Sequence, residues 1–218
     1  MGPNVFHRQE SVTRMTTSRS APPEHSRNKL AEALESFGNV KAKHKRWMNF
    51  SPATIGRTRE LHPHPVYSVR LKRFLAGRPL SATLKRVGWM YFLRDRSTGL
   101  ACAEVSIVSG KHKNARLSEG PFVKEAFQLI EKSIRDPRIG RHRHALRSLR
   151  LESMHVFCLW IKVDHRAEYF IPVTSSSAVL RAGQWISRRE FTKALRSEGQ
   201  RICTAQERMS YLLEKHRG

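Results

Sequence analysis

Residues 88–108, GWMYFLRDRSTGLACAEVSIV, combine two apolar runs with a polar segment between them. The first run, residues 89–93, is continuously apolar, and the second, residues 100–108, is rich in small and β-branched side chains. The segment between them, residues 95–99, has the Asp, Ser and Gly composition that is typical of a turn. Two short apolar runs on either side of a turn predict a β-hairpin that belongs to the core.

A helix and a second hairpin are predicted to follow this first hairpin. Pro121 suits the first position of a helix, because its missing N–H would be unpaired there in any case, and Pro137 ends the helix. Residues 149–163 then predict a long strand, residues 164–167 a turn and residues 168–173 the return strand. Two hairpins that flank one helix predict an α+β fold, with a small antiparallel sheet of the β-β-α-β-β type and helices packed on it.

Further helices are predicted around this core. A short helix is expected over residues 27–37, and a second one carries an apolar face that ends near Gly77. Two more are expected near the C-terminus, because a hydroxyl residue is followed three positions later by glutamate, as in the capping box, at Ser187 and Glu190 and at Thr204 and Glu207. No internal repeat of fixed period is visible in the sequence.

The chain is predicted to divide into three parts. Residues 1–25 end in Ala-Pro-Pro-Glu and are expected to be a disordered tail. Residues 26–87 are expected to form a basic, partly disordered arm with short helices, because several prolines break this segment into short pieces. Residues 88–218 are expected to form the α+β core domain, including the C-terminal helices.

The charge balance indicates the chemistry of the partner. The 218 residues include 41 Lys and Arg against 18 Asp and Glu, a formal net charge of +23. Such an excess cannot all be paired within the protein, so a positive field reaches the solvent. Nucleic acid is the first partner that this field favours and an anionic membrane surface the second, although a basic surface that only aids solubility is the simpler alternative. No apolar run approaches the roughly 18 residues that a membrane span needs.

Two basic clusters, residues 41–46 and 135–150, are the predicted nucleic-acid interface. Arginine forks bind phosphates bidentately, and the tryptophan beside the first cluster could stack on a base. The sequence contains no RNP strand motif, KH-type GxxG loop or zinc finger, and no evident helix-turn-helix, so phosphate contacts are expected to dominate. The predicted nucleic-acid-binding residues are Lys41, Lys43, Lys45, Arg46, Trp47, Arg70, Arg73, Arg138, Arg141, Arg143 and Arg147.

Two HxH pairs, His62 with His64 and His142 with His144, are the candidate metal ligands. On an extended chain the side chains of residues i and i+2 point the same way, so each pair would offer two imidazoles to one zinc ion. Neither pair has a thiolate or carboxylate ligand at motif spacing. No metal and no other cofactor is therefore predicted.

Asp95 and Glu104, on either side of the first turn, are the candidate catalytic residues of a metal-dependent nuclease. Nucleases of this kind hold Mg²⁺ with carboxylates from adjacent strands beside a lysine. Here Ser106 occupies the position where the motif would place that lysine.

The leading prediction is therefore a non-enzymatic, nucleic-acid-associated protein that binds DNA or RNA through phosphates. A metal-dependent nuclease or other hydrolase, and a protein-interaction module or subunit of a larger assembly, remain as alternatives.

The three cysteines, Cys102, Cys158 and Cys203, are far apart and form no CxxC pair. This pattern favours a reducing compartment, and a cytoplasmic location is predicted. The Arg-, Ser- and Thr-rich composition of residues 1–20 leaves organelle targeting open, and secretion as an effector is also left open. DNA or RNA is the expected partner, with a protein partner as the second expectation.

Overall fold

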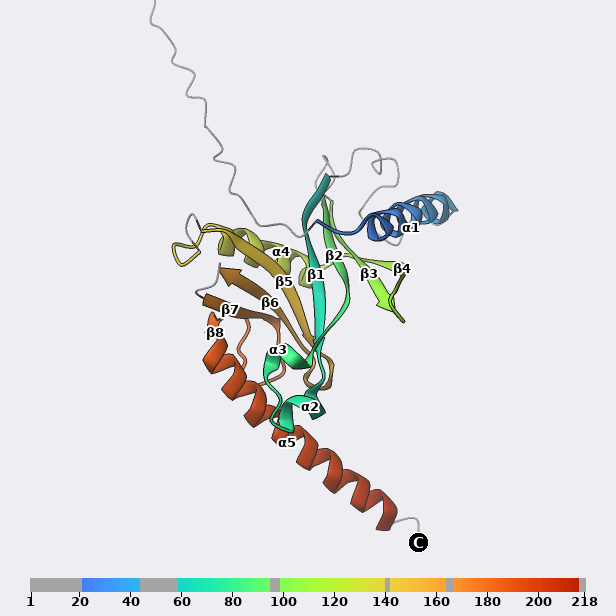
Figure 1. The fold of residues 1–218 in the computed structure, drawn as a ribbon. Helices are drawn as coiled ribbons and strands as arrows, with labels where there is room; N and C mark the ends of the chain where they lie inside the picture. The colour runs from blue at the N-terminus through green and yellow to red at the C-terminus, as the bar shows by residue number, and fades with distance from the viewer. Residues whose placement is uncertain (1–20, 44–58, 95–98, 140–141, 164–166, 216–218) are drawn as a thin grey trace, which may run out of the picture.

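The computed structural model describes residues 21–43, 59–94, 99–139, 142–163 and 167–215 (Figure 1). The strands are β1 (Arg59–Val69), β2 (Leu84–Arg94), β3 (Leu100–Val108), β4 (Lys111–Ser118), β5 (His144–Leu151), β6 (Val156–Val163), β7 (Ala167–Thr174) and β8 (Ile186–Ser187). The helices are α1 (Glu24–Lys43), α2 (Leu71–Leu75), α3 (Leu80–Thr83), α4 (Pro121–Ile134) and α5 (Arg188–Lys215), with a 3₁₀ turn, η2, at Glu152–Met154.

The strands form one mixed sheet of eight in the order β4-β3-β2-β1-β5-β6-β7-β8. Every neighbouring pair is antiparallel except β1 and β5, which run parallel at the centre. The hairpin expected over residues 88–108 is confirmed, since β2 and β3 pair from Gly88 opposite Ser106 to Arg94 opposite Leu100. The prediction of a small antiparallel sheet of two hairpins is nevertheless wrong, because the sheet is large and mixed.

Three features of the sequence concealed the additional strands. The prolines of β1 argue against a strand, but Pro63 lies at a register shift between Leu61 and His64, where a bulge removes the need for its N–H. At the edge of the sheet, β4 is mostly polar and gives no apolar run. The long strand expected over residues 149–163 is two strands, β5 and β6, separated by η2. Met154 in η2 is apolar, so the sequence gives no turn signal there.

Residues that alternate along the strands divide the core between the two faces of the sheet. On β6, Leu159 packs with Phe127 of α4, whereas the adjacent Trp160 packs with Phe191 of α5. Because neighbouring residues of a strand point to opposite faces, α4 and α5 cover opposite faces of the sheet. On β2, Tyr91 packs with α1 and lies on the same face as α5. We call the two sides the α4 face and the α5 face.

The order of elements repeats within the chain. Four strands, β1 to β4, are followed by α4, and four more, β5 to β8, are followed by α5. The two sets of strands extend outward in opposite directions from the parallel central pair, and their helices lie on opposite faces. This is the arrangement that an approximate two-fold axis along the strands, between β1 and β5, would produce.

Two helices are longer than the sequence indicates, whereas the helix expected to end near Gly77 is reduced to the five residues of α2. The helix expected over residues 27–37 is confirmed but extends over Glu24–Lys43. The two C-terminal helices expected from separate capping boxes are one continuous helix, α5, whose C-terminal part extends away from the sheet (Figure 1). The segment expected to be a basic arm, residues 26–87, supplies α1, the central strand β1, α2 and α3.

Candidate functional site

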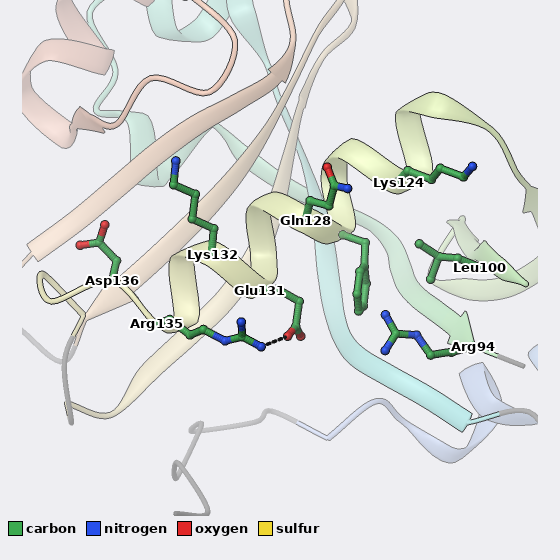
Figure 2. A pocket seen from close by; sticks show the side chains of 9 residues that line it. Arg94, Leu100, Lys124, Gln128, Glu131, Lys132, Arg135 and Asp136 are labelled. Carbon is green, nitrogen blue, oxygen red and sulfur yellow. Dashed lines mark hydrogen bonds and ion pairs between the residues drawn. The ribbon is translucent and has the colours of Figure 1, made fainter. Parts of the chain in front are cut away.

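An open pocket of about 710 Å³ lies along the outer side of α4 (Figure 2). Arg94, the last residue of β2, and Leu100, the first of β3, form one side of it, and α4 and the turn that follows form the other. We call it the α4 pocket. Its lining residues are Arg94, Leu100, Lys124, Phe127, Gln128, Glu131, Lys132, Arg135 and Asp136.

Helical periodicity explains why α4 presents a basic row to solvent. Its buried residues, which include Val123, Phe127 and Ile130, pack against the sheet. The residues on the other side are exposed and follow one another at intervals of three or four, which places them on one helix face. These residues are Lys124, Gln128, Lys132 and Arg135, and the exposed Glu125 lies beside them.

Arg94 is fixed over an aromatic ring. Its guanidinium carbon lies 4.6 Å from the centroid of the Phe127 ring, and Phe127 is itself only 5% exposed. A guanidinium stacked in this way keeps its N–H groups available for hydrogen bonds to an anion. Within the part of the chain that the structure describes, Arg94, Lys124 and Lys132 form no ion pair with a carboxylate.

Both acids of the pocket are already paired with basic side chains. Glu131 lies 2.7 Å from Nε2 of His62 through one oxygen and accepts a hydrogen bond of 3.2 Å from Arg135 through the other (Figure 2). Asp136 accepts three hydrogen bonds from Arg138, two from its guanidinium and one from its backbone N–H. These bonds lower the pKa of the Asp136 carboxyl to about 2. The cations that remain give the pocket a positive field.

Arg138 is held by a second contact. Its guanidinium carbon lies 3.8 Å from the ring centroid of Trp185, which in turn packs edge-on against Tyr169 at 5.4 Å. Together with the bonds to Asp136, this stacking fixes Arg138 beside the C-terminal end of α4. Of the basic residues in the predicted cluster 135–150, Arg135 thus lines the α4 pocket and Arg138 lies close to it.

The other predicted nucleic-acid-binding residues are scattered or lie outside the described part of the chain. Arg70 and Arg73 are exposed at α2, on the α5 face, and Arg143 is exposed just before β5. Arg147 stacks on Trp160 at 4.4 Å, also on the α5 face. The described residues do not include Lys45, Arg46, Trp47 and Arg141, nor the side chains of Lys41 and Lys43.

The sequence-based reasoning missed Arg94, Lys124 and Lys132. They form no cluster along the chain, because Arg94 belongs to the hairpin of β2 and β3 whereas the two lysines belong to α4. The spacing of Lys124, Gln128 and Lys132 on the predicted helix was the available signal, because it places them on the face opposite the apolar residues.

The HxH pairs do not act as pairs of ligands. His62 has a left-handed backbone, with φ of 47°, and its ring reaches Glu131, whereas His64 is 1% exposed and reaches the Ser148 hydroxyl at 2.8 Å. In the second pair His142 is exposed and His144 is buried. Among the described residues no group of three or more His, Cys, Asp or Glu side chains is placed to hold a metal ion.

The candidate catalytic residues have no arrangement suited to hydrolysis in the described part of the chain. Asp95 lies outside the described residues. Glu104 accepts a hydrogen bond of 2.6 Å from the guanidinium of Arg150, so its carboxylate is already neutralised. The contact between His64 and Ser148 has the components of a nucleophile and a base, but both side chains are buried and no substrate reaches them.

None of the described helices combines the length and apolar character that crossing a membrane requires.

Comparison of the chain with protein-family models, with curated proteins and with solved structures finds no match.

Proposed function

We propose that the protein binds nucleic acid without catalysing a reaction on it, and that the α4 pocket holds the phosphates. The observation that supports this function is the charge of the pocket. Three exposed cations, Arg94, Lys124 and Lys132, line it and form no ion pair with the described residues, and the two acids are already paired. An open, positively charged surface of this kind favours a polyanion over a neutral ligand.

The length of the basic row favours several phosphates over one. From Lys124 to Arg135 the row covers 11 residue steps, which at about 1.5 Å per residue is roughly 16 Å. Duplex DNA carries one phosphate about every 3.4 Å along each strand, so the row passes several successive phosphates. Besides its cations, the polar side chains of the pocket are two acids and one amide. Phosphate contacts carry no information about base sequence, so binding at this pocket is expected to be independent of sequence.

A charge-reversal experiment tests the assignment to this pocket. The variant carries Lys124→Glu and Lys132→Glu, and the matched control carries Lys111→Glu and Lys113→Glu on the edge strand β4, where both side chains are exposed. The net charge changes equally in the two proteins. We expect the pocket variant to bind a labelled duplex or structured RNA about 10- to 100-fold more weakly than the unmodified protein, because two phosphate contacts are lost.

The control variant is expected to bind within a few-fold of the unmodified protein. Equal weakening of the two variants would show that binding follows net charge and would overturn the assignment to the α4 pocket. An unmodified protein that fails to bind either nucleic acid at low salt would overturn the proposed function. Thermal unfolding of each variant, followed by circular dichroism, establishes that the fold is retained.

A further inference from the structure

A second basic surface lies on the outer side of α5. It is an open pocket of about 400 Å³ lined by Arg189, Thr192, Lys193, Arg196, Ser197 and Gln200. These residues follow one another at helical spacing on the side of α5 opposite Phe191 and Leu195, which pack in the core. We call it the α5 surface.

The neighbouring α2 adds further positive charge to the α5 surface. Arg196 lies over the ring of Phe74 with 5.4 Å between the guanidinium carbon and the ring centroid, so α2 and this part of α5 are adjacent. Lys72 and Arg73 of α2 are exposed beside it. Residues 70–86, which include α2 and α3, contain six Lys or Arg and no acid.

Of the acids in this part of α5, one is paired with a basic side chain and the other stays ionised close to Arg189. Glu190 accepts hydrogen bonds from the hydroxyl and the backbone N–H of Ser187, which lower its pKa. Glu198 pairs with Arg201 at 2.7 Å. Among the described residues Arg189, Lys193 and Arg196 form no ion pair, so their charge is available to a ligand, as in the α4 pocket.

The two basic surfaces face away from each other. Phe127 anchors α4 on one face of the sheet and Phe191 anchors α5 on the other, and the basic rows lie on the solvent sides of these helices. A duplex has a persistence length of about 150 base pairs, so a short duplex bound along one surface cannot bend round the sheet to reach the other. Each surface therefore takes its own segment of nucleic acid.

We propose that the protein bridges two separate segments of nucleic acid, one held in the α4 pocket and the other on the α5 surface. This proposal rests on the proposed function and adds a second binding surface to it. Its consequence is that one molecule of the protein brings two duplexes together.

Energy transfer between two short duplexes tests the bridging. One duplex carries a donor dye and the other an acceptor dye, and neither contains single-stranded ends that could pair. With the unmodified full chain we expect transfer to rise to a maximum near one protein for two duplexes. When the protein is in excess over the duplexes, energy transfer should fall, because the two duplexes are then bound by different protein molecules.

A variant of the α5 surface separates bridging from binding. Arg189→Gln with Lys193→Gln should still bind a single duplex through the α4 pocket but should lose most of the energy transfer. The matched control, Lys111→Gln with Lys113→Gln on β4, should bind and bridge like the unmodified protein. Both substituted positions of the α5 variant are exposed, so the fold should be retained, which thermal unfolding checks.

The outcomes distinguish this proposal from the proposed function. If the unmodified protein binds a duplex but produces no transfer, bridging is wrong and the proposed function stands. If the α5 variant bridges as well as the unmodified protein, the second segment is held elsewhere, for example by a second copy of the chain, and the proposal is overturned. If no duplex binds at low salt, both proposals fail together.

Discussion

His64 lies beside Phe92 on the α4 face with Nδ1 2.6 Å from the carbonyl oxygen of His62 and Nε2 2.8 Å from the Ser148 hydroxyl. A neutral ring satisfies both contacts, since Nδ1 donates to the carbonyl and Nε2 accepts from the hydroxyl. Burial lowers the pKa of His64 from 6.5 to about 4. The residue that suggested a zinc ligand in the sequence is thus a packed and neutral part of the core.

The lowered pKa of His64 predicts how stability depends on pH. Between pH 4 and 6.5 the unfolded chain binds a proton at this position and the folded protein does not, so the free energy of unfolding should rise with pH across this window. The contribution is at most about 3 kcal/mol. Urea unfolding at several pH values measures it.

The variant His64→Gln is expected to be less stable than the unmodified protein but to show a smaller rise in stability over this pH window. The burial of His112 also lowers the pKa of that residue, so some of the rise should remain. An unchanged dependence on pH in the variant would contradict a neutral, buried His64.

The ion pair between Glu104 and Arg150 predicts the effect of a substitution at Glu104. Because its carboxylate is bound to Arg150, Glu104→Gln should lower the free energy of unfolding by about 1 kcal/mol, since the pair is only partly buried. The same variant should leave the affinity for nucleic acid unchanged. A Mg²⁺-dependent cleavage of labelled DNA or RNA that disappears in this variant would instead favour the nuclease alternative.

Among the elements, those with strong local signals were predictable from the sequence. The proline at the start of α4, the apolar runs of β2 and β3 and the capping box of α5 each depend on residues close together in the chain. The central strand β1 was not predictable, because its prolines argue against a strand and only its pairing with β2 and β5 compensates for them. The prediction that a separate helix begins at Thr204 was wrong, because α5 continues through Thr204 without a break.

The capping box at the start of α5 predicts the effect of one substitution. Ser187 Oγ accepts a hydrogen bond of 3.3 Å from the Glu190 N–H, while the Glu190 carboxylate accepts from the Ser187 N–H at 3.0 Å. Ser187→Ala removes the hydroxyl and should lower the free energy of unfolding by about 1 kcal/mol. Thermal unfolding measures the change, and Ser197→Ala, an exposed serine in the interior of the same helix, is the control. Equal stability of the two variants would contradict the role of the cap.

At the scale of the whole molecule, the repeated order of four strands and a helix places two basic helices on opposite faces of one sheet. The sequence shows no repeat because the two halves share the order of their elements without sharing a pattern of residues. The net charge of +23 predicted a polyanion partner, but it did not locate the site. The α4 pocket depends on the approach of β2 and β3 to α4, which only the folded chain produces.

The slope of affinity against salt tests the account most directly. If Arg94, Lys124 and Lys132 each neutralise a phosphate, log K for a duplex should fall with log salt with a slope of about −3 from this pocket alone. The variant Lys124→Gln with Lys132→Gln should lower the steepness by about two units, and Lys111→Gln with Lys113→Gln should leave it unchanged. Binding that is absent at low salt, or a slope that the pocket variant does not alter, would contradict nucleic-acid binding at the α4 pocket.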